Sequence, residues 1–352
     1  MKIVFIVDSL YSGGAGKVIS LLSSQMTEYG YAAAVITVHD SRRLYKLSDR
    51  VDTEHIDFVS LNYFDRVKEL RRLLKLLKPD VVISFLYNIN VFSILASFFS
   101  KWKIIVSERN DPRSNPSKTA ERLIRNLLYC FADRIVFQTT DAKDYFSGII
   151  QKKGMIIGNP VSNSIPERYV GKRRKAIVAV GRLSQQKNYV MAINAFKRIC
   201  EEFSEYVLEI YGEGEEREKL TKLIRDLGLS ERVVLKGHIG NVLDKIKDAS
   251  LYIMTSDYEG MSNALMEAMQ LGLPVISTDH SGGGARTLIQ DGYNGIISPV
   301  KDDEMFAKKI AMVLSDEKLR EKISYNAYNI NYTFSVKNIT DKWIRLIDSI
   351  SK

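Results

Sequence analysis

Short apolar runs alternate with longer segments of helical periodicity along almost the whole of this 352-residue chain. Strands that alternate with helices predict a parallel sheet covered by helices on both faces. The pattern restarts near the middle, which predicts two doubly wound α/β domains. The length agrees, because single cores rarely grow past roughly 250–300 residues. The expected strands are 3–7, 33–38, 81–85, 103–106 and 134–138, then 176–180, 206–211, 233–235, 251–254 and 274–277.

The segment between the two patterns is predicted to be an exposed interdomain linker. Residues 161–175 contain Pro166 and end in the basic run 172–175, a composition typical of linkers. We therefore expect an N-terminal domain, a second domain and a final helix that packs back towards the N-terminal domain, over 1–160, 161–334 and 335–352.

The net charge of +9 is unevenly placed along the chain. Residues 1–160 hold 23 Lys and Arg against 16 Asp and Glu, so they contribute +7 of it. Such a surplus is typical of proteins that bind nucleic acid, an anionic membrane or a phosphorylated molecule. No nucleic-acid-binding motif accompanies it, so we expect no nucleic-acid partner.

Compartment signals favour the cytoplasm. Cys130 and Cys200 are too few for a disulfide framework. The apolar N-terminal run is too short for a signal peptide, and no stretch approaches the roughly 20 apolar residues of a spanning helix.

The segment after the run 251–254 carries the most chemistry. Gly260 permits a tight turn, and Ser262 or Asn263 can cap the following helix, whose first N–H groups make an anion site. Glu259 and Glu267 lie about 12 Å apart along the axis. One carboxylate is thus available for each end of a ligand that places sugar hydroxyls at one end and ribose hydroxyls at the other. The alternative is a capped surface helix with two solvated glutamates.

Glu259 and Glu267 have the spacing E-x7-E, which resembles the signature of retaining nucleotide-sugar glycosyltransferases of family 4. The resemblance covers nearly the whole chain and implies the GT-B fold, in which two Rossmann-like domains face a central cleft. The further matching motifs are 13–14, 158–161, 181–183 with Lys187, 212–214, 237–238, 272–276 with Asp279, and 292–295.

This resemblance implies a role for each donor-site residue. Arg182 and Lys187 would hold the diphosphate, as a forked and a point charge respectively. Glu259 would bind donor-sugar hydroxyls and Glu267 the ribose. Further contacts with the donor, mostly through the backbone, are expected at Gly13, Gly14, Gly212, His238, Ile239, Gly260, Met261, Ser262 and Asn263.

No metal or cofactor is expected beside the nucleotide-sugar substrate. The family typically uses cations and helix dipoles in place of a metal. No D-x-D motif occurs, and the histidines are scattered along the chain, at 39, 55, 238 and 280.

The segment after the run 103–106 departs from the common family pattern. Many members carry a histidine near the transferred sugar, and Glu108 takes that place here. The run resembles bacterial transferases that build capsule, exopolysaccharide and lipid-linked oligosaccharides. It implies that Glu108, Arg109 and Asn110 lie on the acceptor side, with Glu108 taking part in catalysis. The alternative is an ion pair between Glu108 and Arg109.

The acceptor class suggests a location at the membrane. Lipid-diphosphate-linked acceptors lie at the cytoplasmic leaflet, so we expect peripheral attachment to an anionic surface. The basic, leucine-rich stretch 66–78 and the aromatic stretch 98–103 have a suitable composition. The alternative is that the leucines pack on the sheet and the cations are merely solvated.

The sequence therefore predicts transfer of a hexose or N-acetylhexosamine from a UDP-sugar to a lipid-linked glycan. Galactose and N-acetylgalactosamine are the first candidates for the sugar, and GDP-mannose is left open as donor. A nucleotide-sugar epimerase or hydrolase on the same fold is the main alternative. A dinucleotide oxidoreductase is disfavoured, because residues 13–16 do not follow G-x-G-x-x-G.

Overall fold

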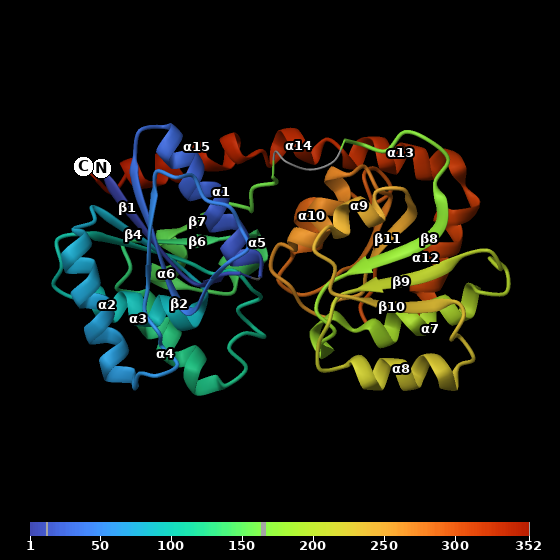
Figure 1. The fold of residues 1–352 in the computed structure, drawn as a ribbon, viewed down its shortest axis with the longest axis horizontal. Coiled ribbons are helices and arrows are strands. Elements are labelled where there is room, and N and C mark those ends of the chain that lie inside the picture. The colour runs from blue at the N-terminus through green and yellow to red at the C-terminus, as the bar shows by residue number, and fades with distance from the viewer. Residues whose placement is uncertain (12, 163–166, 352) are drawn as a thin grey trace. The chain divides into compact units, whose positions relative to one another are not determined.

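The computed structural model describes residues 1–11, 13–162 and 167–351. They form two compact units, shown in Figure 1. The first is Met1–Ser162 with Phe334–Lys352, and the second is Asn163–Thr333.

The first unit contains a parallel sheet in the order β3-β2-β1-β4-β5-β6-β7. The strand order runs outward in both directions from β1 and β4, as in a doubly wound sheet. Residues Ile3 to Val7 of β1 are fully buried, as a strand covered on both faces requires. The strands are β1 (Lys2–Leu10), β2 (Ala32–Arg43), β3 (Val51–His55), β4 (Val81–Phe85), β5 (Lys103–Ser107), β6 (Arg134–Phe137) and β7 (Gly154–Ile156).

Helices cover both faces of this sheet. The buried side chains of α1 and α15 join one apolar cluster, and those of α2, α3 and α4 join another. In α2 the stripe Leu70, Leu73 and Leu74 is buried, so this part of the predicted membrane stretch belongs to the core. The helices are α1 (Gly14–Glu28), α2 (Tyr63–Leu77), α3 (Tyr87–Ser97), α4 (Thr119–Tyr129), α5 (Thr140–Asp144), α6 (Gly148–Lys153) and α15 (Val336–Asp348).

The C-terminal helix α15 packs within the first unit. Trp343 is fully buried and stacks on Phe85 of β4, with ring centroids 5.9 Å apart. The N–H of Val161 donates to the carbonyl of Phe334 at 2.8 Å, where the chain returns to this unit.

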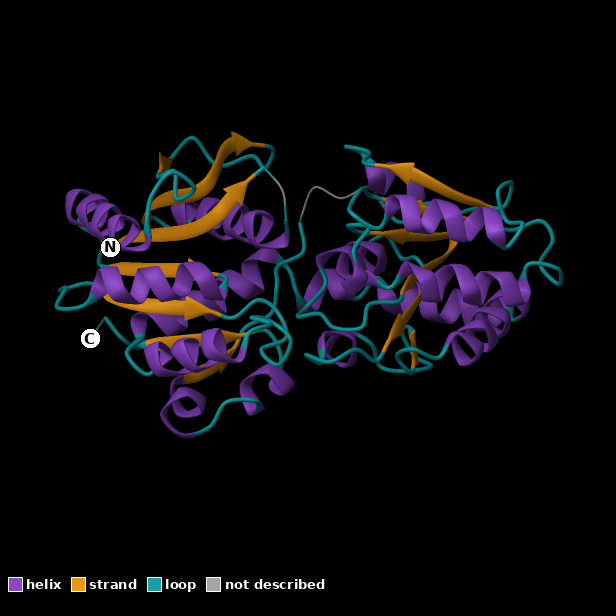
Figure 2. Ribbon diagram, turned by 90° about the horizontal axis from the view of Figure 1, so that it is seen from below, coloured by secondary structure: helices purple, strands orange, loops and turns teal. Residues whose placement is uncertain are grey.

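The second unit repeats the design with a parallel sheet in the order β10-β9-β8-β11-β12-β13. Figure 2 shows helices flanking the strands in each unit. The strands are β8 (Arg174–Val180), β9 (Val207–Tyr211), β10 (Val233–Gly237), β11 (Ala249–Met254), β12 (Val275–Thr278) and β13 (Ile296–Ser298). The helices include a 3-10 turn, η1 (Gln185–Lys187), α7 (Tyr189–Ile199), α8 (Arg217–Asp226), α9 (Val242–Ile246), α10 (Asn263–Gln270), α11 (Gly284–Leu288), α12 (Asp303–Ser315), α13 (Glu317–Ala327) and α14 (Ile330–Thr333).

The prediction of two Rossmann-like α/β domains is confirmed by these two sheets. The end of the predicted linker 161–175 is not an exposed linker in the structure. Arg173 is half-buried and donates to the carbonyls of Lys247 and Ala249 at 3.1 and 3.0 Å, and β8 already begins at Arg174. The predicted linker residue Pro166 lies outside the described residues.

The sequence predicts no membrane-spanning helix, and the helices of the structure can be compared with this. In the part of the chain that the structure describes, no helix is both long enough and apolar enough to span a bilayer.

Candidate functional site

Three glycines hold together the carboxyl ends of β8, β9 and β10. The N–H of Gly181 donates to the Tyr211 carbonyl at 2.9 Å, and the N–H of Gly212 donates to the Gly237 carbonyl at 2.8 Å. A Cβ on Gly212 would overlap the carbonyl of Gly181, so only glycine fits there. The backbone of these loops is thus gathered at the sheet edge where doubly wound domains bind ligands.

Lys187 and Glu259 form an ion pair at the same edge, although 72 residues separate them. Their side chains are only 16% and 14% exposed. Thr255 Oγ1 donates to the Lys187 carbonyl at 2.9 Å, and Asn188 donates to the Asp257 carboxylate at 2.9 Å. These bonds tie the two loops together and fix the cation beside the carboxylate.

Helix α10 begins four residues after Glu259. Of the two candidate caps, Ser262 fills the position: its Oγ accepts the N–H of Leu265 at 3.5 Å. A Cβ on Gly284 would overlap the carbonyl of Gly260, so a glycine lets the loop after β12 lie directly against the start of the helix. The positive end of the helix dipole therefore lies next to Lys187 and Glu259.

A buried tyrosine, Tyr252, lies within the electrostatic influence of both carboxylates of the E-x7-E motif. Tyr252 is fully buried, and its hydroxyl has no hydrogen-bond partner among the described residues. Burial raises the pKa of Tyr252, and the neighbouring Tyr189, Glu267 and Glu259 raise it further. Both carboxylates thus lie near one buried residue of the second unit, with Glu267 just over one turn along α10.

His280 is part of this region and was missed by the sequence prediction. It is fully buried after β12, its Nδ1 lies 3.1 Å from the Ser281 carbonyl, and its Nε2 has no partner in the described part of the chain. Burial lowers the pKa of His280, against the effect of Glu259, so the ring is neutral near pH 7. The available signal was its position two residues before the glycine run 282–284.

The other predicted donor contacts differ in exposure. Arg182 is exposed after β8 and pairs with no carboxylate in the described residues. His238 is exposed after β10, whereas Ile239 is half-buried. At the start of α10, Met261 is buried and Asn263 half-buried.

Gly13 and Gly14 belong to the first unit. Gly13 has a φ of 87° and precedes α1, which begins at Gly14. Left-handed backbone of this kind favours glycine. The loop thus has the small side chains that a close approach to a ligand requires.

Glu108 follows β5 in the first unit, and its carboxylate is buried, with 2% exposed. The hydroxyl of Tyr129 donates to it at 3.0 Å, and Arg125 Nη1 lies 3.8 Å away. Burial raises the pKa of Glu108 to about 7, although Arg125 and Tyr129 oppose this. The carboxyl therefore changes its charge near neutral pH.

The alternative ion pair between Glu108 and Arg109 is not formed, because Arg125 takes that place. Arg109 instead donates to Asn159 at 2.7 Å and lies 4.2 Å over the Phe85 ring. Burial lowers the pKa of Arg109 to about 9. Asn110 accepts the N–H of its neighbour Asp111 at 2.8 Å.

Within the ranges described, no group of three His, Cys, Asp or Glu side chains is arranged to hold a metal ion. That the reaction needs no metal stays a prediction.

Comparison with known proteins identifies the family. The sequence profile of glycosyltransferase family 4 matches residues 12–164, and that of glycosyl transferases group 1 matches residues 163–330. The chain belongs to the family 4-like GT-B glycosyltransferases.

Two relatives that match this chain over nearly their whole length are named as glycosyltransferases. The chain is 28% identical to a Campylobacter jejuni α-1,4-N-acetylgalactosaminyltransferase that acts on a diNAcBac-diphospho-undecaprenol-linked saccharide, over 99% of both chains. It is 24% identical to the amylovoran biosynthesis glycosyltransferase AmsD of Erwinia amylovora, over 97% of this chain and 98% of that one.

Solved structures agree on the fold of this glycosyltransferase. Anabaena HepE with UDP and glucose superposes with a TM-score of 0.85 at 20% identity, over 99% of this chain and 100% of that one. The lipopolysaccharide outer core galactosyltransferase WaaB superposes with a TM-score of 0.75 at 21% identity, over 99% of both chains.

Proposed function

We propose that this glycosyltransferase moves a hexose or N-acetylhexosamine from a UDP-sugar to a polyprenyl-diphosphate-linked saccharide, with retention of the anomeric configuration. The observation that carries the proposal is the cluster of Lys187, Glu259 and the start of α10 at the carboxyl ends of β8 and β11. It combines a cation and a helix dipole for a diphosphate with a carboxylate for sugar hydroxyls.

Charge stabilisation is the chemical task proposed for this cluster. When the bond to the sugar breaks, the departing UDP gains negative charge on its diphosphate. Lys187, the exposed Arg182 and the dipole of α10 are placed to stabilise that charge. Glu259, which neutralises Lys187 in this structure, is proposed to turn to the donor sugar when UDP-sugar binds.

Retention without an enzymatic nucleophile would follow from attack on the face from which the diphosphate leaves. A phosphate oxygen of the departing UDP then takes the proton of the acceptor hydroxyl. NMR of the product anomer tests this step, and an inverted anomer would overturn it.

The choice of donor and acceptor rests on the relatives. HepE was solved with UDP and with UDP-glucose, which supports UDP as the nucleotide. Two Campylobacter relatives transfer N-acetylgalactosamine to undecaprenyl-diphosphate-linked saccharides, which supports that acceptor class and makes UDP-N-acetylgalactosamine the first donor to test.

Peripheral attachment to a bilayer is proposed through an apolar patch on α4 rather than through α2. Leu123 and Leu127 lie four residues apart on α4 and are each 65% exposed. Phe131 and the fully exposed Phe99 both contact the ring of Phe98 and extend the row. We call Phe99, Leu123, Leu127 and Phe131 the α4 patch.

Cations accompany the α4 patch. Lys101 and Lys118 are exposed, and Lys118 directly precedes the helix. Apolar side chains beside cations suit an anionic lipid surface, because the first enter the interface while the second face the head groups.

A turnover screen tests the proposed activity. Purified protein is given a panel of UDP- and GDP-sugars with and without a polyprenyl-diphosphate-linked monosaccharide, and UDP release and product mass are measured. We expect acceptor-dependent release of UDP from one sugar. Formation of an epimeric nucleotide sugar or of free sugar without acceptor would instead assign an epimerase or a hydrolase.

A further inference from the structure

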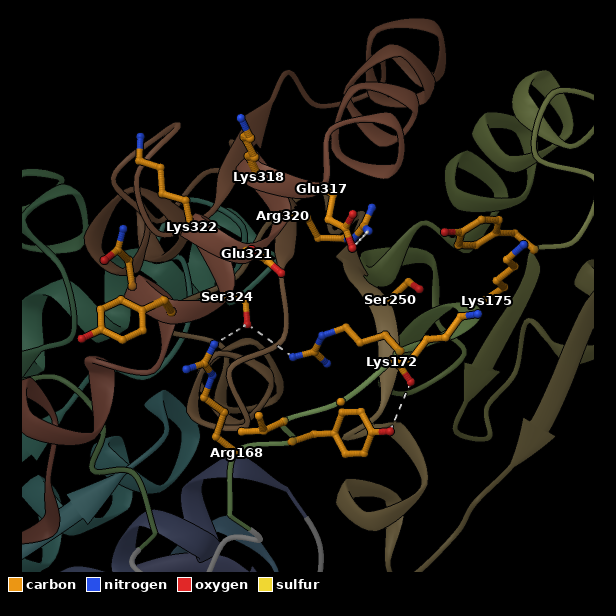
Figure 3. A pocket seen from close by; sticks show the side chains of 17 residues that line it. Arg168, Lys172, Lys175, Ser250, Glu317, Lys318, Arg320, Glu321, Lys322 and Ser324 are labelled. Carbon is orange, nitrogen blue, oxygen red and sulfur yellow. Dashed lines mark hydrogen bonds and ion pairs between the residues drawn. The ribbon is translucent and has the colours of Figure 1, made fainter.

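A cavity of about 700 Å³ lies in the second unit, away from the donor site, and is shown in Figure 3. It is lined by residues 168–173 and Lys175, by α13, by Tyr206, and by Ser250 near the start of β11. The donor site lies at the carboxyl end of β8 and this cavity at its amino end. Seven residues separate the two, roughly 20 Å at 3.3 Å per residue. No residue assigned above to the donor site lines the cavity.

The lining is strongly cationic. Seven of its 17 residues are Lys or Arg, and two are Glu. Glu317 is 79% exposed and stands 3.9 Å from Arg320, so it neutralises the interior only weakly. Within the described ranges, Arg168, Lys172 and Arg173 pair with no carboxylate.

Two guanidinium groups of the lining converge on Ser324. Arg168 and Arg173 both donate to the hydroxyl of Ser324, at 3.5 and 3.3 Å, and Figure 3 shows Arg168 reaching Ser324. The Nε of Arg168 is buried and has no partner among the described residues. Burial and the charges of Arg168 and Arg320 lower the pKa of Arg173 to about 10. An anion between the two groups would relieve this repulsion.

Aromatic rings line the same cavity. Arg173 lies 5.9 Å from the ring centre of Tyr169, and Arg168 lies 5.5 Å from that of Tyr325. These contacts hold the guanidinium groups in place. The volume is typical of sites for small organic ligands and exceeds what one phosphate needs.

We propose that this cavity binds a phosphorylated small molecule, with its phosphoryl or diphosphoryl group between Arg168 and Arg173. Arg173 also donates to the carbonyls of Lys247, Ala249 and Gly272, so it has a structural role as well. Arg168 is therefore the residue on which the ligand depends most clearly.

Calorimetric titration with inorganic pyrophosphate tests the site. Arg168→Gln should weaken binding at least tenfold, because it removes a charged donor that would hydrogen-bond the phosphoryl group. Lys187→Ala alters the donor site and should still bind pyrophosphate at the cavity. Arg168→Gln should lose this binding. Lys222→Gln on α8 removes an exposed cation outside the cavity and should stay within twofold.

A second variant guards against misfolding. The double substitution Lys172→Gln and Lys318→Gln changes only exposed side chains of the lining and should also weaken binding, with an unchanged melting temperature. The proposal would be overturned if wild type did not bind pyrophosphate. It would also be overturned if wild type, Arg168→Gln and the double variant bound pyrophosphate equally.

Flotation with vesicles of phosphatidylglycerol separates the two sources of a phosphoryl group. We expect pyrophosphate binding to depend on Arg168 and flotation not to depend on it. That result would assign the site to a soluble ligand. Flotation lost in Arg168→Gln but kept in Lys222→Gln would overturn the assignment to a small molecule and give the site to a lipid head group.

Discussion

At the scale of single residues, the proposed function requires that the ion pair of Lys187 and Glu259 opens before a diphosphate binds Lys187. The two side chains are mostly buried, so the carboxylate both occupies Lys187 and repels an incoming phosphate. The two residues should therefore affect UDP binding in opposite directions.

We expect Lys187→Ala to weaken UDP binding and to lower kcat by roughly 10²–10³, the usual effect of removing a preorganised charge. Glu259→Gln should lower kcat as well, yet bind UDP at least as tightly as wild type. Calorimetry with UDP and initial rates measure both, with Lys222→Gln as the control. Equal weakening of UDP binding by both variants would contradict this account.

Glu108 provides a pH-dependent prediction at the same scale. Its folded pKa of about 7 lies above the ordinary value of 4.5, so the folded protein holds this proton more tightly. The stability gained is complete below pH 4.5 and is lost as the pH rises through 7. Relative to Glu108→Gln, the free energy of unfolding of wild type should fall across this window, by at most about 3 kcal/mol.

Chemical denaturation of both proteins at pH 5, 6, 7 and 8 measures this difference. If the free energy of unfolding of wild type relative to Glu108→Gln stayed constant or rose with pH, the titration of Glu108 in this window would be excluded. In the same variant we expect turnover to fall far more than donor affinity, because Glu108 lies in the first unit.

The sequence could identify some of these residues and not others. Glu259 and Lys187 stand in motifs with known spacing, so their roles could be proposed. The partner of Glu108 could not be found, because Arg125 is 17 positions away on another element and its guanidinium is buried against backbone carbonyls. For His280 the sequence offers only the nearby glycine run 282–284, and its full burial is what identifies it.

At the scale of elements, close backbone contacts hold the donor loops in place. Gly284→Ala would push the new methyl group into the carbonyl of Gly260 and displace the start of α10. We expect at least tenfold weaker UDP binding. Gly240→Ala meets open space and is the matched control, expected within twofold. Calorimetry measures both, and equal affinities would show that this contact does not position the site.

The α4 patch makes a second prediction for a single element. Replacing Leu127 and Phe131 by Ser should reduce flotation with phosphatidylglycerol vesicles at least tenfold, because each buried apolar side chain contributes about 1.5–3 kcal/mol. Tyr332→Ser removes a side chain that is 71% exposed in the second unit and should have no effect. Flotation unchanged in the double variant would remove α4 as the membrane contact.

Strand prediction succeeded where a strand is covered on both faces and so forms an apolar run, as in β1 and β4. It failed for β3, because Val51 is its one buried residue and the edge strand has no apolar run. It failed for β7 and β13 because three residues are too short for a pattern. The leucines of α2 fit both a core and a membrane pattern, which only packing can separate.

At the scale of the whole molecule, the uneven charge has two structural counterparts. The +7 of residues 1–160 includes Lys101 and Lys118 beside the α4 patch. The second half is nearly balanced, yet it gathers seven cations in one cavity away from the donor site. The proposed anion sites therefore follow from the local grouping of charge and not from its sum.

The path of the chain makes the last prediction. The chain leaves the first unit after Ser162 and returns at Phe334, so α15 follows the second unit in sequence but fills the core of the first. Deleting 334–352 removes the fully buried Trp343, whose loss alone typically costs about 3–5 kcal/mol. Hydrogen exchange should then show faster exchange in β1 and β4, and unchanged protection in β8 and β11. Protection lost first in β8 and β11 would mean that α15 stabilises the unit it follows in sequence, and not the one it packs into.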